Sequence, residues 1–217
     1  MLPVLPGVCV FASAFGAAAG QKGLTLWQAI SMSAFVYAGA SQMVVLELWR
    51  ETWSLSTLLA IMAVTATVNA RMILMGASIQ PWLAPAPKAQ NAINLFFFTD
   101  ASWLIGTRYR AQGGSDLGTL FGAGIILWVA WVASTVPGFL AGALVTEPRR
   151  YGIDLVMPIF FSAMIVPLWK GVRSAIPWMV AGAVALAVDA LAPGYLFIVA
   201  GALAGALAGA LLGAADG

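Results

Sequence analysis

The residues of this 217-residue sequence that could do chemistry are polar side chains set inside long apolar stretches. In an apolar environment a polar or ionisable side chain needs a partner or a ligand, because burial without one is costly. These polar residues, with Gly39 and Phe97 as neighbours, form four groups along the chain: Gly39, Ser41 and Gln42; Asn69 and Arg71; Phe97, Thr99 and Asp100; and Asp154.

Arg71 and Asp100 have opposite charges and lie deep in two different apolar stretches. An unpaired carboxylate there would take up a proton, so Asp100 is the natural partner of Arg71. Two interpretations stay open. The residues form a structural ion pair, or Arg71 recognises the carboxylate of a ligand.

Gly39 and Ser41 weaken the helix in the middle of the apolar stretch 24–48, and Gln42 places a polar amide deep in the same stretch. Two alternatives follow. Either the small residues allow close helix packing while Gln42 bonds a neighbour, or the helix is unwound and its free backbone groups bind a carboxylate or an ammonium group. Asp154 lies near the end of its stretch, where a solvated acid is favoured.

The composition identifies the class of protein to which these stretches belong. Hydrophobic residues make up 62% of the chain and charged residues only 8%, whereas a soluble domain has about 25% charged residues. The sequence therefore predicts an integral membrane protein embedded in the lipid bilayer. With no His and a single Cys, it excludes zinc fingers, catalytic triads and disulfide frameworks. We expect no enzyme activity, no metal, no cofactor and no nucleic-acid partner.

A helix needs about 20 apolar residues to cross the hydrocarbon, so the charged residues mark the ends of the spans. This spacing predicts an all-α protein of seven or eight transmembrane helices, some broken or re-entrant, in one domain over residues 1–217. Prolines 81, 85 and 87 are expected to form a loop. The expected segments are residues 3–20, 24–48, 55–79, 89–107, 117–145 and 153–169, with two more in 174–215.

Two further patterns concern packing and symmetry. Glycines four residues apart at Gly201, Gly205, Gly209 and Gly213 predict a close-packing face for an internal helix or for another subunit in an oligomer. A faint similarity between residues 11–14 and 160–163 indicates a weak inverted repeat.

The order of four motifs resembles one known family. Tyr-Ala-Gly-Ala-Ser-Gln (37–42), Asn-Ala-Arg (69–71), Phe-Thr-Asp (98–100) and the Pro-rich stretch Met-Pro-Ile-Phe-Phe-Ser-Ala-Met-Ile-Val-Pro-Leu (157–168) are similar to those of the AzlC family, the large subunits of branched-chain amino-acid exporters. The similarity extends from about residue 7 to the C-terminus. Met72 and Ala101 stand where the family has a His and an acid, which removes two titratable groups.

The resemblance implies a multi-pass permease of the bacterial inner membrane that exports branched-chain or similar apolar amino acids, driven by proton exchange. It also implies a small AzlD-type membrane subunit. Arg71 or helix N-termini near Gly39 would bind the substrate carboxylate, and Phe97 would help to shape an apolar pocket. Asp100 and Asp154 are the candidates for proton coupling. A channel for a small neutral solute and a structural or assembly subunit are the alternatives.

Overall fold

The computed structural model describes residues 4–49, 54–144, 171–191 and 196–214, which are almost entirely helical. The elements in these ranges are α1 (Leu5–Gln21), α2 (Leu26–Ser31), the π-helix η1 (Met32–Val36), α3 (Gly39–Leu48), α4 (Leu55–Leu83), α5 (Lys88–Phe96), α6 (Asp100–Ala111), α7 (Gly118–Leu144), α9 (Val172–Leu191) and α10 (Leu196–Ala214). The predicted all-α class is confirmed for this part of the chain.

Two of the described helices are long and apolar enough to cross a membrane. They comprise Leu55–Leu83 and Gly118–Gly142, and four further apolar helices are shorter. Asp154, the expected segment 153–169 and the Pro-rich motif at 157–168 lie outside the described residues.

Two of the expected continuous segments are interrupted. The segment expected at 24–48 stops at the end of η1 and resumes as α3, with Tyr37 and Ala38 between them. The segment expected at 89–107 is two helices, because the chain leaves the helix at residues 97–99 between α5 and α6. Both interruptions lie directly beside candidate site residues.

The loop expected at the prolines begins later than predicted, because α4 continues through Pro81 to Leu83. A proline inside a helix removes one backbone hydrogen bond. The residues after it compensate: Trp82 and Leu83 are buried beside Leu120, and the Trp82 indole N–H donates to the carbonyl oxygen of Ser115 at 2.9 Å. Burial of this apolar turn outweighs the lost bond.

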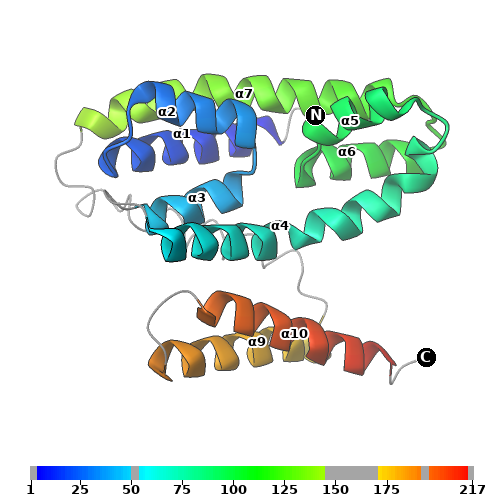
Figure 1. Cartoon of the computed structure of the whole chain (residues 1–217). Helices are drawn as coiled ribbons and strands as arrows, with labels where there is room; N and C mark the ends of the chain where they lie inside the picture. The colour runs from blue at the N-terminus through cyan, green and yellow to red at the C-terminus, as the bar shows by residue number, and fades with distance from the viewer. Residues whose placement is uncertain (1–3, 50–53, 145–170, 192–195, 215–217) are drawn as a thin grey trace. The chain divides into compact units, whose positions relative to one another are not determined.

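The chain divides into two compact units, Met1–Trp49 with Asn69–Val156 and Arg50–Val68 with Met157–Gly217. In the first unit α7 is the common support. It packs against α1, α2 and η1 along one part of its length and against α5 and α6 along another, as Figure 1 shows in lime, blue and green.

The contact between α1 and α7 depends on glycines that let the two backbones approach closely. A Cβ atom at Gly16 would overlap the backbone of Thr135, and one at Gly138 would overlap the backbone of Ser13. The Ser13 hydroxyl also donates to the carbonyl oxygen of Ser134 at 3.1 Å. This contact between α1 and α7 holds α7 in place, and the candidate site is built against α7.

In the second unit α9 and α10 pack against each other through the Gly-rich face of α10. A Cβ at Gly201 or Gly205 would lie 2.8 Å from atoms of Ala181, and Gly209 faces the Pro177 ring. Within the described residues, these glycines therefore serve the contact with an internal helix.

Candidate functional site

The first helix break is held in place by α7. Tyr37 has φ 45° and ψ 42°, a left-handed conformation that is uncommon for a bulky residue. The turns before it are tied down at two points: the Trp128 indole N–H donates to the carbonyl oxygen of Ala34 at 2.9 Å, and the hydroxyls of Ser33 and Thr135 lie 2.8 Å apart. Backbone strain of this kind concentrates at functional sites.

Beyond the break, α3 begins with a first turn that no side chain of the described residues caps. The N–H groups of Gly39, Ala40 and Ser41 lack intrahelical partners, as in the first turn of any α-helix. The Ser41 hydroxyl donates back to the carbonyl oxygen of Ala38 at 2.9 Å and accepts from the Asn69 amide at 3.1 Å. This contact joins α3 to α4.

The second break differs from the first because its helix start is capped. Thr99 and Ser102 form a capping box in which the Thr99 hydroxyl accepts from the Ser102 N–H at 3.3 Å and the Ser102 hydroxyl accepts from the Thr99 N–H at 2.8 Å. Two donors of this turn, the Thr99 and Ser102 N–H groups, are therefore satisfied within the chain.

The two breaks meet at Gly124, in the second turn of α7. The Tyr37 hydroxyl donates to the Gly124 carbonyl oxygen at 3.5 Å, and the Thr99 side chain lies close to the Tyr37 side chain. On the other side, a Cβ at Gly124 would lie 2.5 Å from the carbonyl oxygen of Phe97. A glycine is therefore required where the second break crosses α7.

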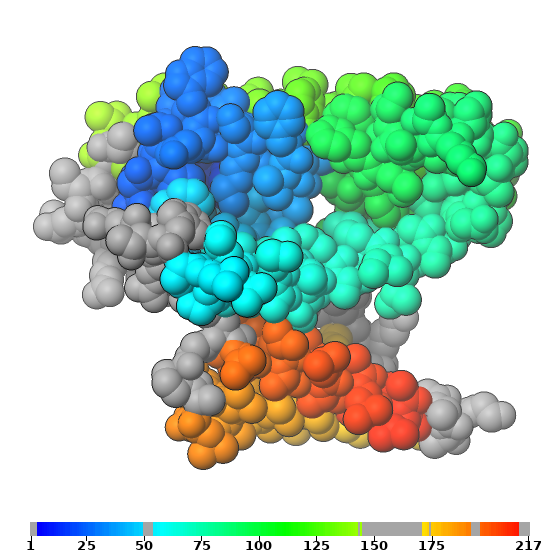
Figure 2. All heavy atoms as spheres, viewed as in Figure 1, coloured from blue at the N-terminus to red at the C-terminus, as the bar shows by residue number. Residues whose placement is uncertain are grey.

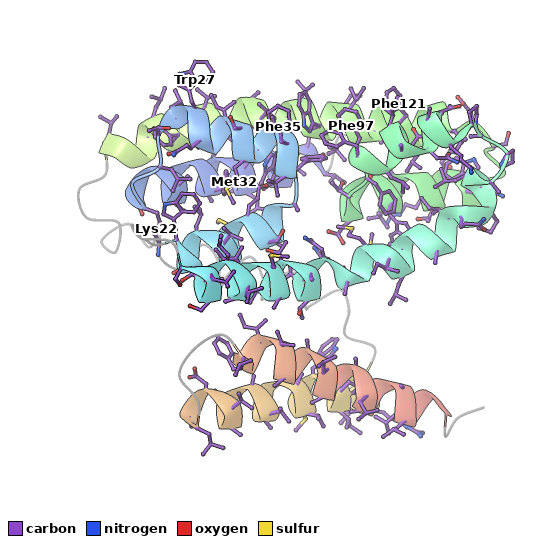
Figure 3. All side chains as sticks on the ribbon, in the orientation of Figure 1. Lys22, Trp27, Met32, Phe35, Phe97 and Phe121 are labelled. Carbon is purple, nitrogen blue, oxygen red and sulfur yellow. The ribbon has the colours of Figure 1, made fainter. Side chains whose placement is uncertain are left out.

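Phe97 is fixed in this break by other aromatic rings. Its ring meets those of Phe121 and Trp128 edge-on, with centroids 5.8 and 5.7 Å apart, and Figure 3 labels Phe97 and Phe121 in this part of the unit. Edge-to-face pairs of this kind stabilise a defined ring position. Phe97 thus helps to anchor the break against α7.

An ion pair joins α4 to the start of α6. Nη2 of Arg71 lies 2.9 Å from Oδ2 of Asp100, and the two side chains are 36% and 42% exposed. Asp100 is the first residue of α6, where the helix dipole favours a negative charge. Figure 2 shows the surface of this unit hollowed between the blue α2–α3 segment and the green α5–α6 segment. The exposure of the pair leaves both charges accessible to a ligand.

Five side chains of the unit carry a buried polar atom without a hydrogen-bond partner among the described residues: Gln42, Trp131, Arg71, Asn91 and Asn94. Gln42 and Trp131 are the two that lie at the first helix break. Gln42 is fully buried, and neither atom of its amide has a hydrogen-bond partner among the described residues. Trp131 is 5% exposed, and its indole nitrogen likewise has no partner in the described part of the chain. Such groups are rare in native proteins and require an explanation.

The structure brings most of the sequence-predicted site residues into one connected network within the first unit. Ser41 and Asn69 bond each other, Arg71 pairs with Asp100, and Thr99 precedes Asp100 and contacts Tyr37. The sequence interpretation did not identify Tyr37, Gly124 or Trp131 as site residues. Tyr37 is adjacent to the Gly39 motif, but Gly124 and Trp131 lie in an uncharged stretch that carries no signal. Within the described residues, no cluster of three His, Cys, Asp or Glu could hold a metal ion.

Residues 3–145, which include every described member of this network, match the family model whose description is AzlC protein. The chain belongs to the AzlC family. The resemblance inferred from the motifs is thereby confirmed. No curated protein and no solved structure matches the chain. Membership of the AzlC family makes the chain a membrane transport-related protein and associates it with transporters rather than with a family of enzymes.

Proposed function

We propose that this AzlC-family protein exports branched-chain or similar apolar amino acids across the bacterial inner membrane, as a multi-pass permease, in exchange for protons. The observation that carries the proposal is the meeting of two helix breaks at Gly124, in the unit that holds the Arg71–Asp100 pair. Broken helices that expose polar backbone beside paired charges are how transporters bind small polar ligands within a membrane.

An apolar amino acid is a zwitterion, so its site must supply donors for a carboxylate, acceptors for an ammonium group and an apolar wall. Arg71 and the uncapped first turn of α3 supply the donors. Asp100 and Ser41 supply the acceptors, and Phe97 belongs to the aromatic wall. The neutral zwitterion also explains why a site with one positive and one negative side chain suits this substrate.

Proton exchange in this chain runs through carboxylates, because the sequence has no His. Asp100 is the first of them, since adding a proton to it ends its ion pair and frees Arg71. Asp154 is the second carboxylate of the proposed pathway. We further propose that export requires a small AzlD-type membrane subunit.

The test is efflux from proteoliposomes loaded with leucine, valine or methionine. Wild type is compared with Asp100→Asn and with a control, Glu47→Gln, which removes a carboxylate from the exposed ion pair with Lys22 at 3.2 Å. Saturable efflux that is lost in Asp100→Asn and kept in Glu47→Gln supports the proposal. Efflux that does not saturate would favour a channel for small neutral solutes, and absence of efflux with and without the small subunit would refute export.

A further inference from the structure

Two sets of hydrogen-bonding groups at the start of α3, and one more on an indole ring packed against it, are left unused by the described chain. The first-turn N–H groups of Gly39, Ala40 and Ser41 have no side-chain cap in the described residues. Gln42, one position further along, is fully buried with both amide atoms unpartnered in the same part of the chain. A helical side chain lies over the turn that precedes its own Cα, so the Gln42 amide is directed toward this N-terminus.

The third group comes from α7. A Cβ at Gly39 would lie 2.5 Å from Cη2 of the Trp131 indole and 3.0 Å from the Phe11 ring, so both rings are packed against the first residue of α3. The rings of Phe11 and Trp131 meet edge-on with centroids 5.4 Å apart. The indole N–H of Trp131 is the buried donor described above as having no partner in the described chain.

We propose that the first turn of α3, Gln42 and Trp131 bind the head group of the amino acid, its α-carboxylate and α-ammonium together. This inference rests on the proposed function and identifies which groups of that site hold the substrate. The free N–H groups and the Trp131 N–H donate to the carboxylate, at the end of a helix that favours negative charge. The Gln42 amide donates from Nε2 to the carboxylate and accepts at Oε1 from the ammonium group.

This assignment gives the substrate a first subsite that does not require the ion pair to open. All the carboxylate donors of this subsite are neutral, so the head group can occupy it while Arg71 is still paired with Asp100, and the two charges reach the substrate only when that pair opens. The first turn of α6 at the other described break is a less suitable carboxylate subsite, because the capping box takes up its Thr99 and Ser102 N–H groups and the turn itself carries the negative charge of Asp100. The head group therefore binds first at α3, and the charge pair at α6 takes part once it opens.

The experiment measures binding to purified protein of L-leucine and of two analogues that each lack one half of the head group. 4-Methylpentanoate has the carboxylate alone, and isopentylamine has the ammonium group alone. The variants are Gln42→Leu and Trp131→Phe, with Gln90→Leu on the exposed surface of α5 as the control. The melting temperature of each ligand-free variant reports folding independently of binding.

We expect both variants to weaken leucine binding by about ten- to a hundredfold, the effect of one hydrogen bond to a charged group. Trp131→Phe should weaken 4-methylpentanoate and leave isopentylamine unchanged, whereas Gln42→Leu should weaken both analogues. Gln90→Leu should match wild type. Leucine affinity that is unchanged in folded Gln42→Leu and Trp131→Phe overturns the head-group site.

Efflux assays on the same preparations distinguish this failure from failure of the proposed function. If wild type exports leucine and both variants export it with an unchanged KM, the head-group site is wrong and export stands. If wild type binds leucine through Gln42 and Trp131 but does not export it, the export proposal is wrong and the site stands. If wild type neither binds nor exports leucine, both are wrong.

Discussion

At the scale of single residues, the Arg71–Asp100 pair is poorly explained as a stabilising contact. Both side chains are more than a third exposed, and exposed ion pairs contribute only about 0.2–1 kcal/mol. We therefore expect Asp100→Asn to lower the free energy of unfolding by less than about 1 kcal/mol while abolishing proton-driven export. Thermal unfolding in detergent and leucine efflux, measured on one preparation, check the two halves of this prediction.

A charge swap distinguishes a role of Arg71 and Asp100 in coupling from the alternative that they form only a structural ion pair. A double variant, Arg71→Asp with Asp100→Arg, restores an ion pair between α4 and α6. If the pair is only a structural contact, the swap should recover the activity that each single variant loses. We expect no recovery, because the carboxylate of the proposed proton pathway then lies on α4 and no longer at the start of α6. Wild-type efflux from the swapped protein would contradict a role in coupling.

Gln42 offers a second test at the residue scale, because a ligand group and a structural group respond differently to removal of the amide. A buried polar group without a partner destabilises the fold by about 1–3 kcal/mol, so Gln42→Leu should raise the stability of the ligand-free protein by an amount within that range. Gln90→Leu, on an exposed surface, should leave it unchanged. A melting temperature that falls in Gln42→Leu would mean that the amide is already satisfied in the native protein.

At the scale of helices, the site depends on α7 holding both breaks at Gly124. A Cβ there would lie 2.5 and 2.8 Å from Phe97 atoms, one of them a backbone oxygen that cannot rotate away. We expect Gly124→Ala to displace the second break, to cost about 1–3 kcal/mol of stability and to reduce export strongly. Gly122→Ala is the matched control, since a Cβ at Gly122 has no atom within 4 Å. Equal efflux from the two variants would argue against the meeting point.

The same elements show what the sequence could and could not predict. The sequence predicted an unwound helix at Gly39 and Ser41 as one of two alternatives, because small residues weaken a helix locally. The break at residues 97–99 was not predicted, because Phe97 and Phe98 continue the apolar stretch with no Gly or Pro to end the helix, although Thr99 followed by Ser102 is the spacing of a capping box. Trp131 could not be recognised, since only the folded α7 brings its indole to Gly39.

At the scale of the whole molecule, the exposed surface is that of a protein surrounded by lipid. Among the described residues, Trp27 and Phe35 are 75% and 77% exposed, and Leu144 and Leu191 are 84% and 85% exposed. Figure 3 shows Trp27 projecting away from α2. Large exposed apolar side chains in several helices would promote aggregation in water, whereas a bilayer accommodates them. The exposed apolar side chains thus suit the membrane location of the proposed transport cycle, in which the proton gradient across the bilayer is the proposed source of energy for uphill export.

That gradient supplies the last prediction, which concerns the intact transporter in a sealed vesicle. Because the chain lacks His, we expect proton entry to require Asp100, and its protonation to separate Arg71 from Asp100 once in each cycle. In proteoliposomes that contain the small subunit and have an acidic exterior, leucine should leave against its own gradient. A protonophore should abolish this uphill flux and leave downhill leucine exchange intact. Asp100→Asn should lose net leucine efflux and keep only leucine–leucine exchange, and Glu47→Gln should behave like untreated wild type. Uphill export that persists in Asp100→Asn would assign coupling to another group, and flux indifferent to the proton gradient would exclude proton exchange.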